Sequence, residues 1–180
     1  VYRKRAKMSL LGPNHYLVHG VYLGASELEW IVDSGASITV TPEVELQMSH
    51  GIPLTGRLRE LGFQPSIGVD VESNISGDMF TIMRMAMQTQ RNLDNQCIAQ
   101  KTKMPAQKLS IKPKEALEWA TIESAKALRL DKKVGSLKPG KQADLILINK
   151  NDLNLFPVID AVEAVVFHAN WSNVDTVIIA

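Results

Sequence analysis

The chain has 180 residues, of which 45% are hydrophobic and 22% charged, and its formal net charge is +1 at pH 7. This composition predicts a globular protein with one sizeable core, and the near-neutral charge excludes the strong field that a nucleic-acid partner needs. No apolar run approaches the roughly 18 residues of a membrane span, so we expect a small-molecule ligand and no membrane partner. The lone cysteine, Cys97, rules out an internal disulfide and favours the reducing cytoplasm. A short basic cluster, Arg3-Lys4-Arg5-Ala6-Lys7, fits a solvated helix face.

Up to about residue 132, strand-like and helix-like segments alternate in the rhythm of a parallel sheet. A helix is predicted from an N-cap at Ser26, with Glu29 three residues later, to Gly35. A polar loop is expected between Pro42 and Pro53. The predicted strands cover residues 16–20, 37–41 and 64–69. The other predicted helices cover residues 53–61, 77–90, 112–119 and 123–130.

The pattern changes after Lys133. A turn-rich segment, 135–141, leads into an apolar run at 145–148. Two further strands are predicted over 162–167 and 174–179, with no helix between them. The chain is therefore expected to consist of a βα part, residues 1–132, and a small β appendage, residues 133–180.

Two of the predicted strands are followed by a polar residue that can carry chemistry. His19 closes the first apolar run and Asp70 closes the third. In a βα barrel such residues point into the mouth where the loops build the active site. From the residues alone other interpretations stay open, because Asp70 also fits a turn or helix cap and His19 also fits a hydrogen-bonded core histidine.

Four segments, in their order along the chain, carry a resemblance to a known family. They are His19-Gly20-Val21-Tyr22-Leu23, Thr41-Pro42 with Gly51-Ile52-Pro53 behind it, Gly68-Val69-Asp70, and the run Gly-Ser-Leu-Lys-Pro-Gly-Lys-Gln-Ala-Asp-Leu at 135–145. Together they resemble the C-terminal half of the amidohydrolase superfamily, in the branch of the cytosine deaminases, adenosylhomocysteine deaminases and triazine chlorohydrolases. The resemblance implies an α/β fold, a partial TIM (β/α) barrel with about its last three strands and their helices, followed by strands of a small β-sandwich appendage.

The resemblance also implies roles for individual residues. Asp70 matches the metal-binding aspartate after the eighth barrel strand, which takes the proton from the metal-bound water. His19 matches the histidine after the sixth strand, which polarises the attacking water or the reacting centre of the substrate. Glu45 and His50 fall in the loop after the seventh strand, where relatives contact substrate. Many relatives have Pro-x-Ser-Asn there, whereas this chain has Pro42-Glu43-Val44-Glu45, so the substrate does not follow from the resemblance.

The function implied by the resemblance is metal-dependent hydrolysis of a C–N bond in a nitrogen heterocycle, as in a deaminase. The implied cofactor is a divalent metal, zinc or iron, which makes hydroxide available near neutral pH. Hydrolysis of an amide or a halide by the same machinery is a second possibility. A third is a non-catalytic barrel remnant that serves as a subunit or interaction module.

One departure from the family bears on activity. Relatives supply a His-x-His pair from the first barrel strand and a histidine from the fifth, and no His-x-His occurs in this chain. Zinc needs at least three protein ligands, so the chain is expected to be a fragment that is inactive by itself. A partial barrel has open sheet edges, and we expect it to form a homo-oligomer.

Overall fold

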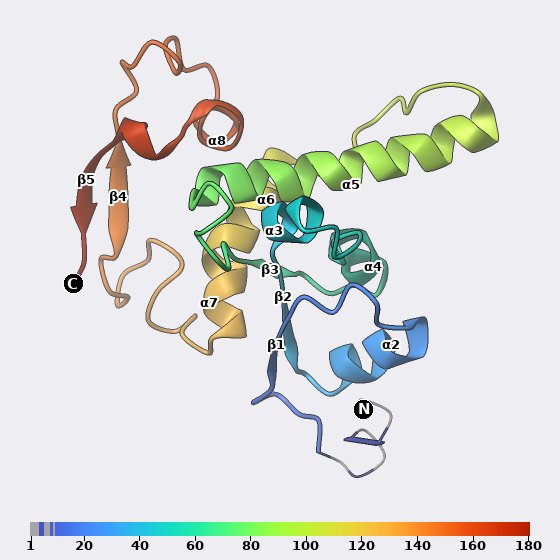
Figure 1. Ribbon diagram of the computed structural model, residues 1–180. Coiled ribbons are helices and arrows are strands. Elements are labelled where there is room, and N and C mark those ends of the chain that lie inside the picture. The colour runs from blue at the N-terminus through green and yellow to red at the C-terminus, as the bar shows by residue number, and fades with distance from the viewer. Residues whose placement is uncertain (1–3, 6–7, 9) are drawn as a thin grey trace.

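The computed structural model describes residues 4–5, 8 and 10–180, so most of the basic segment 3–7 lies outside the described residues. The first part of the chain is built on a sheet of three parallel strands in the order β1-β2-β3 (Figure 1). The strands are β1 (Tyr16–Val18), β2 (Ser37–Val40) and β3 (Ser66–Ile67). The predicted parallel pairing is confirmed, and every residue of the central strand β2 is buried.

Helices connect and cover these strands. They are α2 (Ala25–Asp33), α3 (Pro42–Gln47), α4 (Thr55–Glu60) and the long α5 (Met79–Thr102), which crosses the molecule above the sheet in Figure 1. Leu28 and Ile31 of α2 and Leu58 of α4 are at most 1% exposed and form one buried cluster with the apolar residues of β2. Helix packing on this parallel sheet therefore forms the core that holds the strand ends in place.

Two details of this part differ from the predictions. The N-cap of α2 is Gly24 rather than Ser26, because the backbone N–H of Gly24 donates to the carboxylate of Glu27 at 3.2 Å. The expected polar loop after Pro42 contains helix α3, in which Pro42 occupies the first turn together with Glu43 and Glu45. Proline at the helix start and acidic residues in the first turn both favour a helix there.

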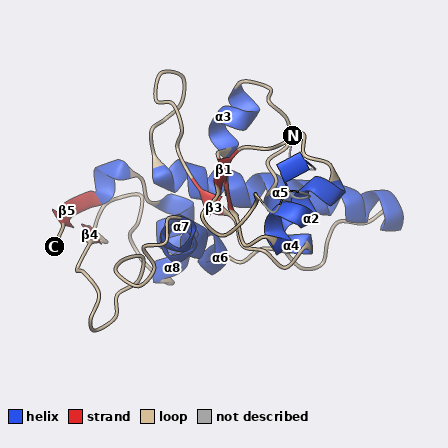
Figure 2. Cartoon of the chain, turned by 90° about the horizontal axis from the view of Figure 1, so that it is seen from below, coloured by secondary structure: helices blue, strands red, loops and turns tan. Residues whose placement is uncertain are grey.

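A second helical stretch follows α5. It consists of α6 (Pro113–Glu118), a π-helical segment (Trp119–Glu123) and α7 (Ser124–Ala127). Figure 2, a view from below, shows α6 and α7 between the parallel sheet and the C-terminal part of the chain. Trp119 is completely buried in the same cluster as the residues of α2 and β2.

The C-terminal part holds an antiparallel pair of strands, β4 (Leu145–Ile148) and β5 (Val174–Ile178), which form a separate sheet. The prediction of a strand over 162–167 is wrong. That segment is helical, as α8 (Ala161–Glu163) and a π-helical segment (Ala164–His168), and a short 3-10 turn (Trp171–Asn173) precedes β5.

Local capping and one tertiary contact explain why this apolar segment is helical. The Asp160 carboxylate accepts the N–H of Glu163 at 2.8 Å and so caps the start of α8. At the other end, Arg84 of α5 donates to the carbonyls of Phe167 and Ala169 at 3.1 and 2.8 Å. These interactions satisfy helix-end groups that a strand would not present.

The division at residue 132 stays a prediction. Leu155, Ala164 and Val166 of the C-terminal part belong to the same buried cluster as the core of the βα part. Over the described ranges, none of the helices combines the length and apolarity that a bilayer crossing requires.

Gly135 offers a sharp test of the packing between the turn-rich segment and α7. It has a φ of +84°, and an added Cβ would lie 2.6 Å from the Ala125 Cβ. Gly140 has a similar φ of +87° but nothing within 4 Å of such a Cβ. We expect Gly135→Ala to lower the free energy of unfolding by about 3 kcal/mol and Gly140→Ala by about 1 kcal/mol. Urea unfolding followed by circular dichroism measures both, and equal losses would contradict the contact.

Candidate active site at the strand ends

His19 and Asp70 lie at the carboxyl ends of β1 and β3 in an uncommon backbone conformation. Their φ angles are +68° and +71°, a region that few residues other than glycine adopt. The N–H of His19 donates to the Thr39 carbonyl at 3.0 Å, which continues the pairing with β2 past the last residue of β1. Such strained positions concentrate at functional sites.

The two side chains face each other. His19 Nε2 is 3.6 Å from Asp70 Oδ2, and the side chains are 31% and 33% exposed. The structure thus brings together the two residues that sequence analysis had placed after the first and third strands. Both remain open to solvent, so a small molecule can reach them.

The other ring nitrogen of His19 faces the protein interior. His19 Nδ1 is 2.9 Å from Thr41 Oγ1 and 3.3 Å from Glu45 Oε1. Glu45 is fully buried, and its Oε2 has no hydrogen-bond partner among the described residues. Sequence analysis did not identify Thr41 as a site residue, although it follows β2 directly, just as His19 follows β1.

Burial raises the pKa of the Glu45 carboxyl above its ordinary value, and this effect exceeds the lowering by hydrogen bonds from Thr41 and His19. The Glu45 side chain is buried and contacts Nδ1 of His19, whereas sequence analysis placed it among the residues that contact substrate. A buried carboxylate held by an imidazole can orient that ring.

His50 completes the group. Its ring lies perpendicular to that of His19, with 5.9 Å between the ring centroids. The loop after α3 places it there, since the N–H of His50 donates to the Glu45 carbonyl at 2.8 Å. The remaining histidines lie elsewhere: His15 precedes β1, and His168 ends the π-helical segment rather than the strand expected there.

The donor types at the site suit zinc, but their number does not complete a metal site. The Asp70 carboxylate is a donor of the kind that zinc takes, and His19 Nε2 lies 3.6 Å from its Oδ2. Within the part of the chain that the structure describes, no three His, Cys, Asp or Glu side chains are grouped to hold a metal. Asp70 therefore fits only a portion of a metal site.

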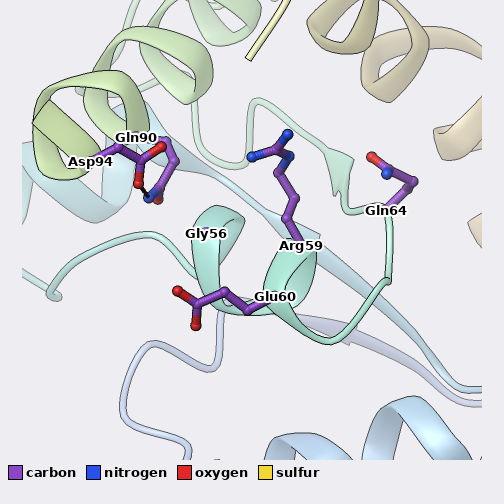
Figure 3. A pocket seen from close by; sticks show the side chains of 6 residues that line it. All are labelled: Gly56, Arg59, Glu60, Gln64, Gln90 and Asp94. Carbon is purple, nitrogen blue, oxygen red and sulfur yellow. Dashed lines mark hydrogen bonds between the residues drawn. The ribbon is translucent and has the colours of Figure 1, made fainter. Parts of the chain in front are cut away.

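A pocket of about 260 Å³ lies between α4 and α5, and none of the four predicted site residues lines it (Figure 3). The guanidinium of Arg59, which lines this pocket, forms an ion pair with the Glu115 carboxylate at 2.8 Å. Gln90 donates to Asp94, one turn further along α5, at 2.6 Å. Several of the groups that could bind a ligand there are therefore already paired within the protein. The residues lining this pocket are Gly56, Arg59, Glu60, Gln64, Gln90 and Asp94.

The raised pKa of Glu45 predicts a stabilising substitution. The folded state binds this proton more tightly than the unfolded chain does, so the stability due to Glu45 is greatest at low pH and is lost as the pH rises through the raised pKa. We expect Glu45→Gln to increase the free energy of unfolding at pH 8 by about 1 kcal/mol, because it removes the buried charge. The gain should vanish toward pH 4. Urea unfolding at both pH values measures it, and a loss of stability at pH 8 would contradict the raised pKa.

Curated relatives match nearly the whole chain. A 5-methylthioadenosine/S-adenosylhomocysteine deaminase from Teredinibacter turnerae is 33% identical over 179 residues, which are 99% of this chain and 38% of the relative. A 5′-deoxyadenosine deaminase from Methanobrevibacter smithii is 32% identical over 174 residues, 95% of this chain and 37% of the relative. The chain therefore spans less than two-fifths of the length of these relatives.

Solved structures share the fold. An adenosine deaminase from Xanthomonas campestris with bound zinc superposes with a TM-score of 0.83 at 23% identity, covering 98% of this chain and 38% of that one. Guanine deaminase from E. coli gives a TM-score of 0.77 at 19% identity, covering 96% and 39%. The α/β architecture is thus that of part of a larger fold, consistent with a partial barrel. A sequence model of the amidohydrolase family matches residues 3–180, and the chain belongs to the amidohydrolase family.

Proposed function

We propose that the complete protein is a metal-dependent hydrolase that deaminates an aminated nitrogen heterocycle of the adenosine type, and that the 180-residue chain by itself is inactive. The observation that carries this proposal is the contact between His19 and Asp70, 3.6 Å apart at the ends of two parallel strands, in a chain of the amidohydrolase family. Two relatives that are more than 30% identical are named as deaminases of adenosine derivatives, which supports a deaminase over a non-catalytic subunit.

The roles of the two residues follow from their groups. A divalent metal, zinc or iron, when bound, supplies a water whose pKa is lowered toward neutrality. Asp70 would be one of its ligands, and its carboxylate is the group that accepts a proton from water and passes it to the leaving amine. His19 presents Nε2 beside that carboxylate, where it can hydrogen-bond either the attacking water or the reacting centre of the substrate.

His50 is the residue we propose for substrate contact. It lies in the loop after α3, and its ring is perpendicular to that of His19 with 5.9 Å between the ring centroids. An imidazole can both stack on a purine ring and hydrogen-bond its nitrogens. Because the described residues offer too few ligands for a metal, further ligands would have to come from outside them.

Release of ammonia tests the proposal. The protein produced from its own gene is incubated with 5′-methylthioadenosine, S-adenosylhomocysteine, 5′-deoxyadenosine and guanine, and ammonia is measured by a coupled assay. We expect turnover of at least one of the adenosine derivatives, abolished by a metal chelator. If none of them releases ammonia and a chlorotriazine releases chloride, the proposed reaction is wrong and the protein is a dehalogenating hydrolase.

Self-association is the proposed consequence of the open sheet. Both β1 and β3 are edge strands in this sheet, and Tyr16 and Val18 on β1 are 46% and 42% exposed. Unpaired strand edges with apolar side chains recruit other chains. We expect the 180-residue chain to sediment as an oligomer, and a monodisperse monomer at micromolar concentration would contradict this.

A further inference from the structure

The two nitrogens of His19 face different surroundings. Nε2 points toward Asp70 and solvent, whereas Nδ1 lies against Thr41 and the buried Glu45. A neutral imidazole carries one proton, and the hydrogen bond made by one nitrogen decides what the other can do. The surroundings of Nδ1 therefore determine the chemistry available at Nε2.

The Glu45 carboxylate can only accept hydrogen bonds when ionised, and its Oε2 has no partner among the described residues. If Nδ1 carried a lone pair, Oε1 would face that lone pair at 3.3 Å. A buried carboxylate facing a lone pair is costly, whereas an N–H donated to it forms a strong, charge-assisted hydrogen bond. The Asp70 carboxylate competes for the proton less strongly, because it lies farther from its ring nitrogen, at 3.6 Å, and is 33% exposed to water. Thr41 fits either arrangement, because a hydroxyl donates or accepts.

We propose that Glu45 is a positioning residue that holds His19 with the proton on Nδ1, so that Nε2 presents its lone pair beside Asp70. An Nε2 lone pair accepts a hydrogen bond from water but cannot donate one to the substrate. Of the two roles open to His19, this selects orientation of the attacking water. That consequence rests on the proposed function, whereas the position of the proton does not.

Nitrogen-15 NMR of histidine-labelled protein tests the assignment. Long-range proton–nitrogen spectra at pH 8 distinguish protonated from unprotonated ring nitrogens, and His19→Gln identifies the His19 signals. We expect the wild type to show a protonated Nδ1 and an unprotonated Nε2, as purified and again after chelation. A wild-type His19 with its proton on Nε2 after chelation would overturn the proposal without the need for any variant.

Three substitutions separate the contributions of the neighbouring groups. Glu45→Gln should lower the ratio of the Nδ1–H to the Nε2–H form by about tenfold, since the charged acceptor is lost. Thr41→Val should leave the ratio within about twofold, because a hydroxyl that can donate or accept favours neither form. Glu43→Gln is the matched control, because this carboxylate in the same helix binds Ser76 at 2.7 Å instead of His19. A shift caused by Thr41→Val and not by Glu45→Gln would assign the role to Thr41 and overturn the proposal.

Kinetics connect the result to the reaction. In a deaminating protein, Glu45→Gln should lower kcat with KM nearly unchanged, because the substrate does not touch the buried carboxylate. If the wild type releases no ammonia, the proposed function fails, while the NMR result for Glu45 still stands. If the tautomer shifts but kcat is unchanged, the position of the proton is confirmed and its use in orienting water is wrong.

Discussion

Asp70→Asn lowers the ammonia-releasing activity of the protein by about 10⁴-fold and leaves its unfolding midpoint close to that of the wild type. The carboxylate that would bind the metal and carry the proton is removed, and proton transfer alone contributes about 10²- to 10⁴-fold to such reactions. Asparagine keeps the shape of the side chain, and it is one of the few residues that readily adopt a φ of +71°. The effect should therefore be on kcat, without loss of the fold.

Glu72→Gln is the control for Asp70→Asn. Glu72 is an exposed carboxylate two residues further along the same loop, so this change removes an equal charge without touching the strand end. We expect at least half of the wild-type activity in Glu72→Gln. If Asp70→Asn kept more than a tenth of the activity, Asp70 could not be both metal ligand and proton carrier.

Trp119→Ala lowers the free energy of unfolding by about 4 kcal/mol. Trp119 is completely buried at the junction of α6 and α7, and it is among the largest fully buried side chains of the described residues. Its Nε1 donates to Gln64 Oε1 at 2.8 Å, which ties this junction to the residues just before β3. The substitution creates a cavity and also leaves the Gln64 oxygen without its donor.

Trp171→Ala is the matched control for Trp119→Ala. Trp171 is 73% exposed in the short turn before β5, so its removal should change stability by less than about 0.5 kcal/mol. Guanidinium unfolding followed by circular dichroism compares the two variants without relying on tryptophan fluorescence. Similar losses from both would contradict the central place of Trp119 in the core.

The parallel sheet and its strand ends were predictable because the sequence signal there is local. The runs that hold β1 and β3 are short, largely apolar and closed by a polar residue. In β2, Ser and Thr alternate with Ile and Val, which is the period of a strand, although all four residues are buried. The polar residue after each run then falls at the edge where βα loops gather. His19 and Asp70 could be placed together on this basis before any contact was known.

The remaining features depend on contacts between distant residues. Helix α3 was missed although Thr41-Pro42-Glu43 is a fair helix start, because the surrounding polar residues suggested a loop. The segment 162–167 has the apolar, β-branched residues of a strand, but Arg84, some 80 positions earlier, binds its carbonyls and favours a helix. The burial of Glu45 beneath His19, 26 residues away in sequence, has no local signal at all.

The metal content of the protein produced from its own gene tests the central claim most directly. Elemental analysis after gel filtration should find close to one zinc or iron per chain in the wild type and in Glu72→Gln, and little in Asp70→Asn. This result would place Asp70 among the ligands independently of any substrate. A wild-type protein that releases ammonia at full rate without bound metal, or an Asp70→Asn variant that keeps both its metal and its activity, would contradict the account.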